Sequence, residues 1–171
     1  CNVAVGTEAM FYNTAGCENT SIEFRSLHCN TTAGSNTAVG FCSLFANTTG
    51  AYNTAVGRSA LTLNTTADYN TGIGWRALLA NTTGARNTAT GMYALHSNTT
   101  SGCNTASGSY SLYANTTAGG GAAFGYKALN SNTTGDQNTA TGLRALRANT
   151  SGGSNTAHGA YALDSNTTAD N

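Results

Sequence analysis

The sequence repeats every 17 residues from Asn2 to its last residue, without an insertion or a deletion. The ten repeats begin at residues 2, 19, 36, 53, 70, 87, 104, 121, 138 and 155. Their consensus is N-T-A-V-G-x-x-A-L-x-x-N-T-T-G-x-x, whose positions we number as columns 1 to 17. An ungapped array requires each unit to sit on the preceding one in the same way. We therefore expect residues 1–171 to form a single repeat array, with residues 1–35 as divergent repeats that form a partial cap or a junction.

The repeat is too short for packed helices and suits one coil of a β-solenoid. Helical repeats need about 30 residues or more, and Asn, Thr and Gly at this density oppose a helix. One repeat provides two or three short strands joined by tight corners, and stacked coils would lie ~4.8 Å apart. The sequence predicts an all-β fold, a parallel β-solenoid (β-roll or β-helix) of ten 17-residue coils.

The nearly invariant columns predict the core and the corners of each coil. Column 9 is Leu except for Met10, column 8 holds only Ala or Ser, and column 3 is mostly Ala, so these columns predict a narrow interior. Column 5 is Gly except for Glu23, which predicts a corner with positive φ or a close backbone approach. The Asn-Thr pairs of columns 1–2 and 12–13 predict equivalent corners on opposite sides, with Asn suited to the left-handed conformation.

Column 12 is Asn in all ten repeats, and two interpretations of it stay open. Stacked identical Asn side chains can hydrogen-bond from coil to coil as an amide ladder. Asn-Thr-Thr is also an acceptor pattern for N-glycans, which would need the side chain to face solvent. Both interpretations concern the same residues: Asn30, Asn47, Asn64, Asn81, Asn98, Asn115, Asn132, Asn149 and Asn166.

The run Asn36-Thr37-Ala38-Val39-Gly40, which recurs at residues 53–57, resembles the core of the head repeats of trimeric autotransporter adhesins. The fuller unit N-T-A-V-G-x-x-A-L-x-x-N-T-T-G also resembles repeat arrays of phage tail-fibre-like and bacterial surface proteins. The resemblance covers the whole chain and implies trimeric, left-handed parallel β-rolls whose exposed faces bind surfaces. The repeat departs from that family in its greater length and in its strict N-T-T.

The aromatic residues lie mostly in variable columns, where they are candidates for surface contacts. A rigid rod could use such side chains to bind sugars or receptors, or to pack against neighbouring chains. The candidates are Phe41, Trp75, Tyr93, Tyr110 and Tyr126. Column 4 changes from Val or Ile in the first five repeats to mostly polar residues in the last five. This change suggests an outer face, with an apolar half that contacts partner chains.

The cysteines and the titratable residues predict no catalytic or metal site. Cys1 and Cys17 fall at stacked corners one coil apart, so a disulfide between them is geometrically reasonable. His28 and His96 share column 10 but stand four coils apart, too far to bind one metal ion. The acidic residues form no recurrent pair for acid–base catalysis. We therefore expect no enzyme activity and no cofactor.

Composition excludes further classes of partner. The chain has 7 Lys+Arg against 7 Asp+Glu, so it has no basic field for nucleic acid. Its apolar runs are too short for membrane insertion. Ice binding is not expected either, because the adjacent threonines of columns 13 and 14 should point to opposite faces. On this basis we expect no flat T-x-T row in any coil.

Both ends of the chain fall at repeat boundaries and lack the polar caps that solenoids need. Either the array continues further, or subunits stack end to end. We therefore predict the structural or adhesive shaft of an extracellular fibre, at a cell surface or on a virion appendage. Its partner would be the chain itself, as a homo-trimer or an end-to-end filament. The alternatives are a filament subunit with N-glycans on its N-T-T corners and a module that binds surface glycans or receptors.

Overall fold

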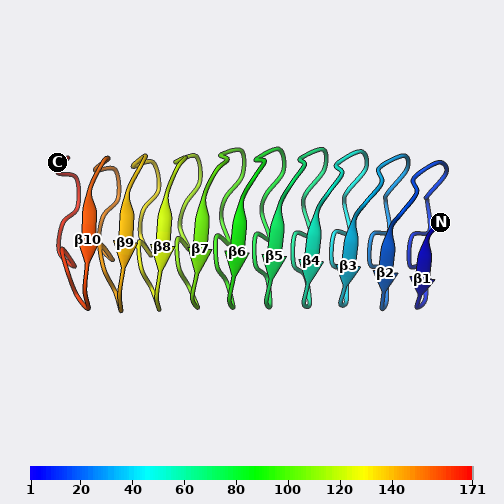
Figure 1. Ribbon diagram of the computed structural model, residues 1–171, viewed down its shortest axis with the longest axis horizontal. Coiled ribbons are helices and arrows are strands. Elements are labelled where there is room, and N and C mark those ends of the chain that lie inside the picture. Colours follow the sequence, from blue (N-terminus) through cyan, green and yellow to red (C-terminus); the bar gives the residue numbers. More distant parts are fainter. Residues whose placement is uncertain (171) are drawn as a thin grey trace.

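The computed structural model describes residues 1–170 and confirms the β-solenoid. Each repeat contributes one strand of three residues, formed by columns 2 to 4. The strands are β1 (Val3–Val5), β2 (Thr20–Ile22), β3 (Thr37–Val39), β4 (Thr54–Val56), β5 (Thr71–Ile73), β6 (Thr88–Thr90), β7 (Thr105–Ser107), β8 (Ala122–Phe124), β9 (Thr139–Thr141) and β10 (Thr156–His158). All ten strands form one parallel sheet in sequence order, aligned side by side along the rod (Figure 1).

The register of the sheet equals the length of the repeat. Thr54 pairs with Thr71, Ala55 with Gly72 and Val56 with Ile73, and every other neighbouring pair of strands follows the same offset. Backbone hydrogen bonds between coils continue outside the strands, for example from Leu61 N–H to the Ala77 carbonyl at 3.0 Å. Each residue therefore lies beside its counterpart, or the neighbour of its counterpart, in the next coil.

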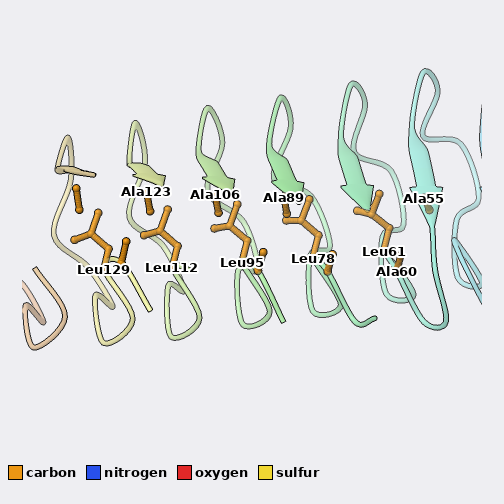
Figure 2. Packing of buried hydrophobic residues seen from close by; sticks show 14 of the residues in the cluster. Ala55, Ala60, Leu61, Leu78, Ala89, Leu95, Ala106, Leu112, Ala123 and Leu129 are labelled. Atoms are coloured by element: carbon orange, nitrogen blue, oxygen red, sulfur yellow. The ribbon is translucent and has the colours of Figure 1, made fainter. Parts of the chain in front are cut away.

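The core is a narrow stripe of Ala and Leu that runs the length of the rod. Column 3 alanines such as Ala89 point inward from the sheet and meet column 9 leucines such as Leu78 and Leu95, which come from the opposite turn (Figure 2). The column 9 leucines from Leu27 to Leu146 have no exposed surface. The interior predicted for columns 3, 8 and 9 is confirmed.

The turn from column 5 to column 12 closes the coil with two hydrogen-bonded bends. In the fifth coil, Ala77 N–H donates to the Gly74 carbonyl at 3.3 Å, and Asn81 N–H donates to the Leu78 carbonyl at 3.3 Å. Gly74 has a φ of 130°, and a Cβ built on it would lie 2.7 Å from the carbonyl carbon of Gly91. Column 5 is therefore glycine because of both its φ and its closeness to the next coil, as predicted.

The other left-handed residues are not the predicted asparagines. Positive φ recurs at columns 7, 9 and 17, as in Arg76 (56°), Leu78 (52°) and Tyr69 (60°). No described Asn of column 1 or column 12 is among these residues, so the prediction of left-handed Asn corners is wrong. A left-handed residue costs about 1–2 kcal/mol, and full burial of a Leu side chain contributes about 1.5–3 kcal/mol. Burial thus offsets the strain at column 9.

Candidate functional site

The column 12 asparagines form a continuous amide ladder inside the rod. Asn64 Nδ2 donates to Asn47 Oδ1 at 3.0 Å and to the Ala67 carbonyl of its own coil at 3.0 Å. Asn81 Nδ2 in turn donates to Asn64 Oδ1 at 2.9 Å. Corresponding coil-to-coil bonds run from Asn30 to Asn166. Each amide thus serves as donor and acceptor, which is what a buried polar group requires.

The column 1 asparagines form a second ladder beside the first. Asn53 Nδ2 donates to the Ala67 carbonyl at 2.8 Å, the same acceptor that Asn64 uses. Asn53 Oδ1 accepts from the backbone N–H of Asn70 in the next coil at 2.9 Å. Both ladders therefore converge on one wall of the coil at column 15. The prediction that the two Asn-Thr pairs occupy opposite sides is wrong.

Burial decides what these asparagines can do chemically. Asn30, Asn47, Asn64, Asn81, Asn98, Asn115 and Asn149 are 0% exposed, Asn132 is 1% exposed, and Asn166 in the last coil is half-buried. An N-glycan on such a buried amide would remove its hydrogen bonds and could not fit inside the folded coil. In the coil that begins at residue 121, Gly121 replaces the column 1 Asn. Asn138 Nδ2, from column 1 of the next coil, donates to the Gly135 carbonyl at 3.0 Å.

Outside the rod, aromatic rings stack in the same coil-to-coil register. In column 17, Tyr52 and Tyr69 have ring centroids 5.0 Å apart and planes within 1° of parallel, and Arg86 lies 5.9 Å from the Tyr69 centroid in the next coil. In column 6, Phe24 and Phe41 stack at 5.3 Å, and Arg58 follows at 5.4 Å from Phe41. A stacked pair followed by a cation is therefore a recurring unit of the outer columns.

The largest such group is an aromatic–cation cluster over the coils that contain β5 to β8. Tyr93 contacts Trp75 at 4.9 Å, Tyr110 at 5.1 Å and His96 at 5.2 Å between ring centroids. Its members are Trp75, Arg76, Tyr93, His96, Tyr110, Tyr113, Tyr126 and Lys127. Four of the five predicted contact aromatics meet here, whereas Phe41 lies in the separate Phe24 stack.

The rings in these stacks turn their faces to one another and to cations. Six of the seven basic side chains lie over rings, and the seventh, Arg147, pairs with Asp164 at 2.7 Å. Because sugars bind to the face of an aromatic ring, a ring such as Tyr69, which lies between Tyr52 and Arg86, offers mainly its edge. The outermost rings, Trp75 (42% exposed) and Tyr126 (43% exposed), are the most accessible rings of the cluster.

Sequence reasoning missed the residues that lie in other columns of these stacks. His28 lies between Phe11 and Phe45, with centroids at 5.5 and 5.2 Å and nearly parallel planes. His96 stacks on Tyr113 at 5.1 Å. These rings all stand in column 10. Rings in the same column of adjacent repeats could therefore have indicated the stacks.

The perturbed carboxyl groups and His96 belong to coil-to-coil contacts, and two thiols are perturbed by burial. Hydrogen bonding to Arg25 at 2.6 Å lowers the pKa of the Glu8 carboxyl, and Arg147 lowers the pKa of Asp164 in the same way. Desolvation, helped by the charge of Arg76, lowers the pKa of His96. Burial raises the pKa of the Cys29 and Cys42 thiols.

The predicted disulfide between Cys1 and Cys17 is wrong, since both residues are free thiols and exposed. The register explains why they do not meet. Glu18 N–H donates to the Cys1 carbonyl at 2.7 Å, and Ser35 N–H donates to the Cys17 carbonyl at 3.0 Å. Glu18, rather than Cys17, therefore lies beside Cys1. The backbone of Cys17 pairs instead with Ser35 of the following coil.

The outward face of the sheet consists of columns 2 and 4. The middle residue of each strand from β2 to β10 is buried, while the flanking residues are half-buried or exposed. Column 4 therefore lies outside, as its change of character suggested, and Ile73 is 40% exposed. The prediction that no coil carries a T-x-T row is wrong, because β6 is Thr88-Ala89-Thr90 and β9 is Thr139-Ala140-Thr141 with both threonines outward.

Across residues 1–170 the structure has no helix that could cross a membrane, no pocket, and no group of three or more potential metal ligands. No family model, no curated protein and no solved structure matches the chain. The regular features of the surface are the coil-to-coil aromatic stacks and the outward face of the sheet.

Proposed function

We propose that the chain is a structural shaft segment of an extracellular fibre, located at a cell surface or on a virion appendage. The observation that carries this proposal is the uniformity of the contacts between coils. The same backbone bonds, Asn ladder and Ala–Leu stripe recur from one end of residues 1–170 to the other. A rod held by identical interactions along its length is extended and stiff and can vary its outer columns freely.

The resemblance to adhesin heads and tail-fibre-like arrays supports assembly with further copies of the chain, as a homo-trimer. Solution mass and electron microscopy test both parts of this proposal. We expect straight rods in micrographs and a mass of three chains by light scattering. A monomeric mass at all concentrations would exclude self-assembly of the chain on its own, and flexible or globular particles would exclude the shaft.

The other two functions have less support from the geometry. A glycosylated filament needs solvent-facing Asn, and the column 12 side chains are buried. A glycan-binding module needs open ring faces, which the stacked rings mostly lack. A glycan array tests the module: reproducible binding that is lost in both Trp75→Ala and Tyr126→Ala would favour it over a passive shaft.

A further inference from the structure

We propose that the outward face of strands β2 to β7 binds ice. The face has two side chains per strand, one from column 2 and one from column 4. Column 2 is Thr in all six of these strands: Thr20, Thr37, Thr54, Thr71, Thr88 and Thr105. Column 4 adds Ile22, Val39, Val56, Ile73, Thr90 and Ser107. This inference does not depend on the proposed shaft.

The face repeats regularly in two directions. Along a strand the outward residues are two positions apart, about 6.6 Å, and neighbouring strands lie about 4.8 Å apart. The strands keep one register and lie in one row along the rod, so these repeats persist across the face (Figure 1). The prism face of hexagonal ice carries water oxygens in a rectangular net. The two repeat distances of that net are similar to the two repeat distances of this protein face. A protein surface can match such a net only if it has this regularity.

The chemistry of the face suits frozen water. Thr, Val and Ile are β-branched and stiff at χ1, so their methyl groups and hydroxyls occupy fixed positions. Columns 2 and 4 contain no Lys, Arg, Asp or Glu in any strand. Fixed methyl groups confine adjacent water, and hydroxyls at regular intervals hold it by hydrogen bonds. A charged side chain would instead order water around itself.

The hydroxyls of column 2 have no partner within the described protein. Of the three Thr-rich columns, 2, 13 and 14, only column 13 has hydroxyls that bond from coil to coil. In column 13, Thr65 Oγ1 donates to the Thr82 carbonyl at 3.1 Å, and the same bond recurs from coil to coil. None of the column 2 hydroxyls, such as that of Thr71, makes a hydrogen bond to residues 1–170. Their hydrogen bonds must therefore go to water.

This difference also distinguishes ice from a second copy of the chain. A dry protein interface would bury the column 2 hydroxyls without partners, which is unfavourable. Ice supplies a lattice of water molecules that can satisfy them. The strip ends at β8, where Ala122 replaces Thr and Phe124 projects from column 4 with 43% exposure.

Thermal hysteresis of the full chain tests the proposal. We expect the wild-type chain to hold a seed crystal below its melting point without growth and to inhibit ice recrystallisation. Thr71→Tyr places a bulky ring on the proposed face and should abolish most of the hysteresis. Thr83→Tyr is the matched control, since Thr83 belongs to the same coil and is exposed, but lies in column 14, outside strand β5 and its outward face. It should keep the wild-type value.

A second matched pair guards against misfolding. Thr88→Leu should reduce hysteresis and Thr100→Leu should not, with circular dichroism as the check that each variant folds. Absence of hysteresis in the folded wild-type chain would overturn the proposal, as would equal losses in the two members of both pairs. The mass of the wild-type chain in solution is the last check. If the wild type forms an oligomer that Thr71→Tyr converts to monomers, a second copy of the chain occupies this face, and the proposal is overturned.

Discussion

The inside and the outside of this rod are built by the same rule but under different physical conditions. The Asn47–Asn64–Asn81 ladder and the Tyr52–Tyr69–Arg86 stack both place one side chain in each coil directly beside its counterpart. Asn64 is 0% exposed, whereas Tyr69 is 53% exposed. Column 12 has no exception in ten repeats, while column 17 holds Glu, Ser, Tyr, Arg, Cys, Gly, Gln and Asn.

The difference shows that burial, rather than stacking itself, imposes identity on a column. A buried amide needs a counterpart in the next coil that both donates and accepts at the same place, as another amide does, because water is absent. In the next coil, an exposed ring can have a ring, a cation or a small residue beside it. Water solvates any part of the ring that no protein group contacts. Substitutions in the two kinds of column should therefore differ in cost.

The largest effect is expected where a buried amide is removed. Asn64→Leu keeps the number and branching of the side-chain heavy atoms but leaves Asn47 Oδ1 and one N–H of Asn81 without partners. At about 1–3 kcal/mol for each orphaned group, the free energy of unfolding should fall by roughly 4 kcal/mol. The control is Asn130→Leu, because half-buried Asn130 makes only one bond, to the Tyr110 carbonyl at 3.1 Å. Urea unfolding that gave equal losses for both variants would contradict the comparison.

A smaller but still large effect is expected at the glycine corner. Gly74→Ala combines a φ of 130° with a Cβ only 2.7 Å from the Gly91 backbone. Such strained backbone costs about 1–3 kcal/mol, so we expect a loss near 3 kcal/mol in urea unfolding. Gly119→Ala is the control, since its Cβ would meet only the Gly102 carbonyl oxygen at 3.4 Å. That variant should unfold at nearly the wild-type urea concentration.

Much of the fold could be predicted because the repeat directly encodes its own register. The period predicts which residues pair, and the Ala and Leu columns predict the core. The path within one coil could not be predicted. Leu78 and Arg76 adopt left-handed φ although neither residue type favours it. Burial of Leu78 offsets its strain, and that gain exists only in the assembled coil, so local propensities pointed to Asn instead.

The candidate surfaces were predictable to the extent that they follow single columns. Trp75, Tyr93, Tyr110 and Tyr126 could be identified as surface aromatics from the variability of their columns. The contact between Tyr93 of column 7 and His96 of column 10, at 5.2 Å, depends on the turn between them. The outward T-x-T pairs could not be predicted without the strand bounds, because only alternate residues of a strand share a face, whereas the conspicuous threonines of the repeat are adjacent.

On the outside, removing one ring should cost little. Tyr69→Ala loses the stack on Tyr52 and the contact with Arg86, and we expect a loss of about 1 kcal/mol. Tyr69→Phe keeps the ring and should match the wild type in urea unfolding. A loss for Tyr69→Ala as large as that of Asn64→Leu would show that outer stacks hold the coils as strongly as the inner ladder does.

The smallest effect is expected from the stack of His96 on Tyr113. Desolvation and Arg76 lower the folded-state pKa of His96 from its ordinary value of 6.5. The unfolded chain therefore binds a proton at a higher pH than the folded chain does, and stability falls as pH decreases below about 6.5. His96→Phe preserves the ring beside Tyr113 and removes the proton site. Urea midpoints at pH 7.5 and pH 5.5 should therefore differ less in this variant than in the wild type. An unchanged difference would mean that the environment of His96 does not couple to folding, and the outer stacks would then contribute packing alone.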